Sequence, residues 1–341
     1  MTMKLGRRTL LGTAAAVTLA PDAKAAGQVI VGTWGGDYAA LLADNIDKPL
    51  LGPAGTEVLQ DVGNQDARRA KITAERSSRR GTMDVACLSD VDLYTMSLLG
   101  VWEPITEENV PNLKHVPKAY RTAYAIPHIV SGKVMVYNPA KMAAPKGFID
   151  MWDSKNAGKL GLIDIQYLYV IMLANLAHGG PMDDFARGKK ALMELKKAAN
   201  PRIYPSNEAF ATGMKTDEVL YGPMWLARGV FWKKGGINMA TAVPSEGAIA
   251  YVSGAAVTKN APNKANGLAY LNTMLEPRAQ NAFAEKMSYA PTTDNANVPA
   301  QLMQEIGFTT AETAAMKYPD FAYLAKETSA LLDWWNKEFK A

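Results

Sequence analysis

The sequence predicts an α/β fold divided into two lobes. From residue 28 onward, short runs of apolar and β-branched residues alternate with longer helical segments, a pattern typical of a mostly parallel sheet covered by helices. The chain has 341 residues, and a chain of this length usually divides because a single core stops growing at about 250–300 residues. We therefore begin from two α/β lobes.

The first lobe is predicted to contain three strands, each followed by a helix. The apolar run at residues 29–31 is the first strand, and the glycine-containing turn at residues 33–36 separates it from its helix. The same order then repeats twice. The predicted strands are residues 29–31, 57–59 and 84–88, and the predicted helices are residues 37–51, 67–78 and 91–99.

Near residue 130 the alternation of strands and helices stops. Residues 125–130 and residues 133–139 are two extended segments in succession, joined by Ser131 and Gly132 without a helix between them. Such a connection suits the passage from one lobe to the other.

A second α/β set follows this connection. Pro277 fits the first turn of a helix, where its missing N–H costs nothing. We predict strands at residues 160–164 and 218–221, extended segments at 238–243 and 250–258, and helices at 167–176, 182–197, 207–214, 224–232, 263–275, 277–287 and 322–339.

The N-terminal residues predict export. Lys4, Arg7 and Arg8 form a basic start, residues 9–20 are mildly apolar, and residues 23–25 have the small-x-small pattern of a signal peptidase site. The paired arginines resemble a twin-arginine signal, with the general secretory route as the alternative. We expect cleavage after Ala25 and a periplasmic mature protein; an N-terminal helix of the mature fold is the other interpretation.

Charge and composition argue against nucleic acid as a partner. Residues 1–25 carry four of the 37 basic and one of the 33 acidic residues, so their removal lowers the formal charge from +4 to +1. A nucleic-acid binder keeps a concentrated basic surface. The one dense basic run, residues 68–80, stands at helical spacing with Asp66 and Glu75, and we interpret it as a solvated helix face.

The sequence offers no catalytic or metal-binding motif. The single cysteine, Cys87, lies in an apolar stretch and is expected to be buried. The three histidines are scattered, and the usual zinc, nucleophile-elbow and phosphate-loop patterns do not occur. We therefore expect no cofactor, no metal and no enzymatic activity.

An ordered set of motifs resembles the family 1 extracellular solute-binding proteins, nearest to the spermidine/putrescine-binding branch of ABC transporter receptors. The resemblance runs from about residue 28 to 295. It rests on residues 33–38, 83–85 with 89–90, 125–127, 148–152 with 158–160, 221–225, 244–247 and 290–292.

This resemblance implies a type II periplasmic binding fold, in which two α/β lobes are joined by a two-strand hinge and close on a solute. The implied first lobe is residues 26–132 and 255–295, and the second is residues 133–254 and 296–341. The implied partners are a small-molecule solute and an ABC permease in the inner membrane, and we expect a monomer.

Most candidate ligand-binding residues lie where strands pass into helices, because helix N-termini direct free N–H groups into the crevice there, and the others lie in the hinge and on the strand that contains residues 251–253. For each aromatic residue, packing in the core is an equal alternative, and a plain tight turn is the alternative for the glycines. The candidates are Trp34, Gly36, Asp37, Tyr38, Ser89, Asp90, Ser131, Lys133, Asp164, Gln166, Asn207, Trp225, Tyr251 and Ser253.

Departures from the polyamine-binding pattern bear on the ligand. Ser253 stands where that branch has an aspartate, residues 165–168 lack the acidic groups expected at the second-lobe helix start, and Lys133 repels a cation if it faces the cleft. We favour a zwitterionic or anionic solute, such as an amino-acid derivative, an opine-like compound or a phosphonate, over a free polyamine. The rival hypotheses are a periplasmic enzyme with Asp90 or Asp164 as general base, and a sensor that addresses a receptor other than a permease.

Overall fold

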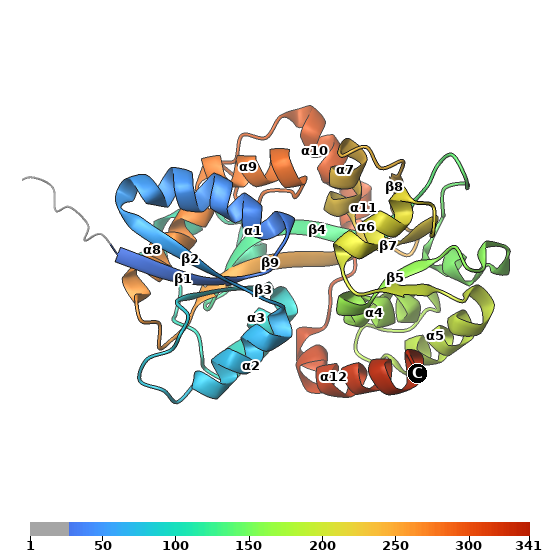
Figure 1. The fold of residues 1–341 in the computed structure, drawn as a ribbon, viewed down its shortest axis with the longest axis horizontal. Coiled ribbons are helices and arrows are strands. Elements are labelled where there is room, and N and C mark those ends of the chain that lie inside the picture. The colour runs from blue at the N-terminus through green and yellow to red at the C-terminus, as the bar shows by residue number, and fades with distance from the viewer. Residues whose placement is uncertain (1–26) are drawn as a thin grey trace, which may run out of the picture.

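The computed structural model describes residues 27–341, which form two lobes lying side by side (Figure 1). The predicted signal peptide, residues 1–25, lies outside the described residues. Within residues 27–341, no helix is both long enough and apolar enough to cross a bilayer. A seven-stranded sheet passes through both lobes in the order β2-β1-β3-β9-β4-β7, with β8 beside β4.

The sheet is parallel only in the first lobe. β1 (Gly27–Thr33) pairs in parallel with β2 (Thr56–Val62) and β3 (Val85–Ser89), as the alternation of strands and helices predicts. The next neighbour of β3 is β9, a strand from far along the chain that runs antiparallel, so the prediction of a mostly parallel sheet is wrong beyond β3. The remaining strands of this sheet are β4 (Ile126–Tyr137), β7 (Tyr221–Trp225), β8 (Ala240–Ala242) and β9 (Ile249–Val257).

β4 and β9 join the two lobes. β9 pairs with β3 through residues 253–257 in the first lobe, and β4 pairs with β7 through residues 133–137 in the second. Between these stretches, residues 130–132 pair with residues 250–252, flanked only by isolated bridges to Ala290 and Lys317. The connection is one continuous strand, whereas the sequence predicted two extended segments around Ser131 and Gly132.

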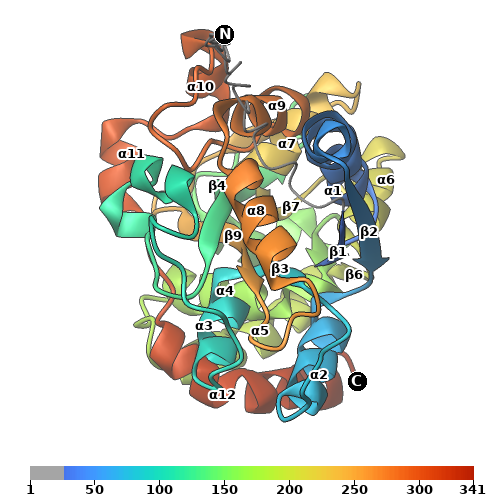
Figure 2. The same cartoon turned by 90° about the vertical axis from the view of Figure 1, so that its left-hand side faces the viewer.

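Helices cover both faces of the sheet in the first lobe (Figure 2). Val29, Val31 and Cys87 point to the face covered by α8, α9 and the π-helical segment that extends α1, whereas Ala86 and Leu88 point to the face covered by α2 and α3. Cys87 is fully buried, as predicted. The bounds are α1 (Asp37–Leu42), its extension (Ala43–Leu51), α2 (Gln65–Glu75), α3 (Asp90–Ser97), α8 (Lys264–Met274) and α9 (Pro277–Met287).

The second lobe is built around an aromatic-rich core. Its two-stranded parallel sheet of β5 (Gly161–Ile163) and β6 (Arg202–Tyr204) is linked to the main sheet by a bridge between Leu160 and Tyr221. β7 ends at Trp225, so the predicted strand at 218–221 and helix at 224–232 are each displaced toward the C-terminus. The helices are α4 (Tyr167–Ala177), α5 (Ala186–Ala199), α6 (Asn207–Lys215) and α7 (Leu226–Lys234).

The C-terminal segment contacts both lobes. α10 (Ala300–Ile306) packs against α9 and α7, and α12 (Phe321–Trp334) packs against α3 of the first lobe as well as α4 of the second. Across the second contact, the rings of Tyr94 and Phe321 lie 5.7 Å apart. The short helix α11 (Thr310–Ala315), which the sequence did not predict, begins at a capping box formed by Thr309 and Glu312.

Candidate functional site

A cavity of about 560 Å³ lies between the lobes. It is lined by the turn after β1, the starts of α2 and α3, and Tyr251 of β9, and from the second lobe by the starts of α4, α6 and α7. Clefts of this size and position, at strand ends and between lobes, are the usual place for a small ligand. We take this cleft as the candidate site.

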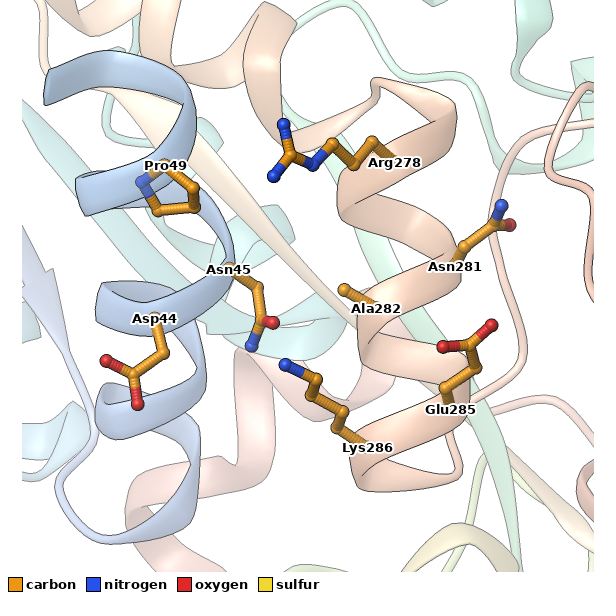
Figure 3. A pocket seen from close by; sticks show the side chains of 8 residues that line it. All are labelled: Asp44, Asn45, Pro49, Arg278, Asn281, Ala282, Glu285 and Lys286. Atoms are coloured by element: carbon orange, nitrogen blue, oxygen red, sulfur yellow. The ribbon is translucent and has the colours of Figure 1, made fainter. Parts of the chain in front are cut away.

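A second hollow lies on the surface of the first lobe alone (Figure 3). It separates the π-helical extension of α1, which carries Asp44 and Asn45, from α9, which carries Arg278, Glu285 and Lys286. Both walls belong to one lobe, so movement of the lobes does not enclose it. We therefore place the functional site in the cleft between the lobes.

The structure brings together more than half of the candidate residues and places the others behind or beside the cleft. The candidates that line the cavity are Trp34, Gly36, Tyr38, Ser89, Gln166, Asn207, Trp225 and Tyr251. Asp37, Asp90, Ser131, Lys133, Asp164 and Ser253 do not line it.

An ion pair joins the two lobes at the cleft. Arg228, in the first turn of α7, donates from Nη1 to Asp37 Oδ2 at 2.8 Å, and its Nη2 lies 3.9 Å from Glu208 Oε1. The Arg228 side chain is 7% exposed, and its Nε has no partner within the described residues. The sequence analysis missed Arg228, although it stands only three residues after Trp225 in a strand-to-helix turn.

Gly36 is suited to its turn by its backbone conformation and lies beside Glu208 of the opposite lobe. Its φ of 65° lies in the left-handed region, and a Cβ at this position would lie 3.5 Å from Glu208 Oε1. This conformation supports the tight-turn interpretation of Gly36, and the same turn places its backbone on the cavity wall.

A second arginine enters the cleft from α2. Arg69 contacts Asp92 at 2.8 Å and Asp66 at 2.7 Å, and Ser89 Oγ donates to Asp92 Oδ2 at 3.1 Å. The neighbouring Arg68 is 4% exposed and donates to the Cys87 carbonyl at 2.9 Å. The prediction that this basic run is a solvated helix face is therefore wrong for both arginines.

Aromatic side chains form the wall near the hinge. The rings of Trp225 and Tyr251 stack with centroids 4.1 Å apart, and Tyr169 meets Trp225 edge to face at 4.6 Å. Lys133 Nζ lies 4.1 Å from the Trp225 centroid, so it must occupy the ring face that Tyr251 leaves free. Both faces of Trp225 are covered by protein, which makes this residue part of the core as well as of the wall.

Lys133 lies behind the wall and not in the cavity. It is fully buried, and within residues 27–341 its side-chain hydrogen bond goes to an amide and not to a carboxylate. Its Nζ donates to Gln166 Oε1, and burial lowers the pKa of Lys133 well below its usual range. Lys133 therefore acts on the cleft only through the residues in front of it.

The two acidic candidates proposed as general bases are engaged elsewhere. Asp164 accepts from Trp335 Nε1 at 2.7 Å and Lys340 Nζ at 3.0 Å, which ties the C-terminal segment to the second lobe. Asp90 accepts from the backbone N–H of Val91 at 2.8 Å and of Val252 at 3.2 Å, and burial raises its pKa to about 7.

Two of the three serine candidates, Ser131 and Ser253, form hydrogen bonds with the backbone near the hinge. Ser131 Oγ accepts from the Ala227 backbone N–H at 3.2 Å, which fixes the start of α7 to β4. Ser253 is fully buried, and its Oγ donates to the Leu88 carbonyl at 3.4 Å. Neither residue lines the cavity.

Residues 55–310 match the family described as bacterial extracellular solute-binding proteins, and the chain belongs to this family. The resemblance found in the sequence is thereby confirmed. The spermidine/putrescine-binding periplasmic protein of Escherichia coli K12 is 27% identical over 188 residues, which is 52% of each chain. The match therefore spans about half the length of that relative.

Solved structures share the fold over nearly the whole chain. An ABC transporter substrate-binding protein from Bradyrhizobium japonicum USDA 110 superposes with a TM-score of 0.79 at 22% identity, covering 91% of this chain and 98% of the other. AgtB from A. tumefaciens R10, in complex with agropinic acid, gives a TM-score of 0.78 at 20% identity, with coverage of 92% and 99%. The fold is the predicted periplasmic binding fold of two α/β lobes joined by a two-strand hinge.

Proposed function

We propose that the chain is the periplasmic substrate-binding component of an ABC importer. It is exported by a signal peptide cleaved after Ala25, captures a small polar solute between its lobes, and delivers that solute unchanged to a permease in the inner membrane as a monomer. Membership of the solute-binding family supports this role, as does the periplasmic location named for the E. coli relative.

The observation that carries the proposal is a cavity enclosed by both lobes beside a narrow connection. Walls from the two lobes meet across about 560 Å³, while few strands cross between the lobes nearby. Bending at residues 130–132 and 250–252 opens and closes such a cavity. A solute that contacts both walls binds the closed form more tightly and thereby shifts the lobes toward closure.

The cavity lining carries both signs of charge, with Arg69 and Arg228 beside Asp66, Asp92 and Glu208, which suits a zwitterionic solute. Arg69 and Arg228 reach the cavity, and the uncharged Ser253 stands where the polyamine-binding pattern has an aspartate. The nearby carboxylates of Asp37, Asp92 and Glu208 suit the ammonium end of a zwitterion. An amino-acid derivative, an opine-like compound or a phosphonate fits this arrangement, and the agropinic acid complex of AgtB is consistent with it.

The enzyme alternative has little support at the two proposed bases. Asp164 is held by Trp335 and Lys340, and Asp90 is held by backbone N–H groups outside the cavity lining. A general base must reach the proton that it removes from the bound molecule.

Native mass spectrometry of gently purified protein, followed by a thermal-shift panel and calorimetry, tests the proposed function. The panel contains γ-amino acids, opines, phosphonates and polyamines. A true ligand at about a hundredfold over its dissociation constant raises the free energy of unfolding by about 2.7 kcal/mol. Stoichiometric binding with the ligand recovered unchanged is expected; chemical conversion of the ligand, or no binding to any solute, contradicts the proposal.

A further inference from the structure

A chain of hydrogen bonds runs from the buried side of the aromatic wall to the cavity. Lys133 Nζ donates to Gln166 Oε1, and Gln166 Nε2 donates to Asn207 Oδ1 at 2.5 Å. Gln166 is 6% exposed and precedes α4, whereas Asn207 is the first residue of α6. Gln166 and Asn207 line the cavity, and Lys133 does not.

The direction of this chain is set at its buried end. Lys133 Nζ carries N–H donors, and in the structure the Gln166 amide turns its oxygen toward them. The Gln166 NH₂ group then faces Asn207, which must offer its oxygen in turn. This sequence of constraints leaves Asn207 Nδ2 as the free end, and Nδ2 has no hydrogen-bond partner within residues 27–341.

Two further unpaired polar groups support a ligand at this part of the wall. The Tyr169 hydroxyl belongs to a residue that is 6% exposed and lines the cavity, yet it has no partner within the described residues. Arg228 Nε is likewise unpaired in a buried side chain on the same cavity. Buried polar groups without partners are costly unless a bound molecule completes them.

We propose that Lys133 is a positioning residue for ligand specificity, which turns the Asn207 amide donor toward the cavity and thereby makes the second-lobe end of the cleft a carboxylate subsite. The inference rests on the proposed receptor function and goes beyond it by naming the ligand group and the residue that selects it. Glu208, the next residue on α6, is directed to Arg228 and Gly36. The start of α6 therefore presents the Asn207 amide donor and the Glu208 carboxylate at different positions in the cleft.

A matched pair of ligands tests the inference. γ-Aminobutyrate and putrescine share an ammonium group and a four-carbon chain, and differ at the other end in a carboxylate or an aminomethyl group. Calorimetry gives the ratio of their affinities for each protein. A residue that only stabilises the fold changes both affinities together, whereas a residue that orients the subsite changes the ratio.

Two substitutions change the direction of the hydrogen bonds between residues 133, 166 and 207 in different ways. Lys133→Met keeps an unbranched apolar side chain and removes the donor, which frees both amides to turn. Gln166→Glu accepts from Lys133 and also requires a donor from Asn207, so the Asn207 oxygen then faces the cavity. The matched control is Lys141→Met, an exposed lysine that pairs with Asp217 far from the cleft.

The wild-type protein and Lys141→Met should both prefer γ-aminobutyrate. Lys133→Met should lower the ratio of the affinity for γ-aminobutyrate to the affinity for putrescine by at least about tenfold. Gln166→Glu should reverse the preference, so that putrescine binds more tightly. If Lys133→Met does not fold, as judged by circular dichroism, Gln166→Glu decides alone.

Three results overturn the inference. A wild-type preference for putrescine, or variants that keep the wild-type ratio, refutes the carboxylate subsite while the receptor function stands. A wild-type protein that carries no solute in native mass spectrometry and binds neither probe refutes the receptor function, and the inference fails with it.

Discussion

Arg228 of α7 and Asp37 of α1 form an ion pair of 2.8 Å across the cleft, although 191 positions separate them in the chain. Arg228 belongs to the second lobe and Asp37 to the first, so this contact exists only while the lobes are close together. Since Asp37 is 38% exposed and Arg228 is 7% exposed, opening the lobes hydrates a charge that closure buries. The pair therefore couples the position of the lobes to the electrostatics of the cleft.

Replacing Arg228 should favour the open form. Arg228→Met removes the contacts with Asp37 and Glu208 and leaves two carboxylates facing each other across the cleft. We expect a larger radius of gyration for the unliganded protein in solution scattering and at least about a tenfold loss of ligand affinity. Asp37→Asn, which removes one of those carboxylates, should have a smaller effect; equal scattering curves for all three proteins would contradict the proposed coupling.

Truncating Trp225 should destabilise the protein even without ligand. Trp225 is 5% exposed, and its two ring faces are covered by Tyr251 and Lys133. Trp225→Ala should lower the free energy of unfolding by about 3–5 kcal/mol, measured by urea denaturation of the unliganded protein. Trp225→Phe should lose less of the free energy of unfolding. An unchanged urea midpoint for the alanine variant would show that the ring contributes only to ligand binding.

Asp90 should make stability depend on pH. Burial raises its pKa to about 7, whereas an aspartate in an unfolded chain titrates near about 4. Between these two pH values the folded protein holds a proton that the unfolded chain has lost, so the free energy of unfolding falls as pH rises. Asp90→Asn should flatten the curve between about pH 4 and pH 7. The exposed Asp333→Asn serves as the control, and equal slopes in both variants would exclude Asp90 as the source.

Asp164 should matter for stability and not for binding. Its carboxylate holds Trp335 and Lys340 and does not line the cavity. Asp164→Ala should lower the free energy of unfolding by about 1–3 kcal/mol, because it leaves the buried Trp335 N–H without a partner. Ligand affinity measured by calorimetry should stay within about twofold of wild type. A large loss of affinity with unchanged stability would show that Asp164 contributes to ligand binding.

Local patterns predicted most strands and helices because each depends on neighbours in the sequence. The strand at residues 29–31 and the helix at 277–287 are examples, since apolar runs and a first-turn proline carry their own signals. The position of β9 beside β3 could not be predicted in this way. Strand order and direction depend on pairing between distant segments, and local composition carries no information about which segments will pair.

The candidate site was likewise predicted only in part, because some of its residues depend on distant partners. Trp34, Gln166 and Tyr251 were found because they follow or occupy strand ends, and they line the cavity. Asp164 has the same local setting, yet its partners lie 171 and 176 residues away and draw it from the cleft. Arg228 was missed for the converse reason: nothing near it in the sequence indicates that Asp37 will neutralise its charge.

The position of α12 has a consequence for how a bound molecule leaves. Because this helix packs against α3 as well as α4, the two lobes are in contact through α12 in addition to the ion pair of Arg228 and Asp37. In the proposed receptor, opening of the lobes therefore has to break the contact of α12 with either α3 or α4, and Phe321 and Tyr94 belong to the first of these contacts. We expect substitutions in this helix contact to change the dissociation rate of the proposed ligand, although neither Phe321 nor Tyr94 lines the cavity.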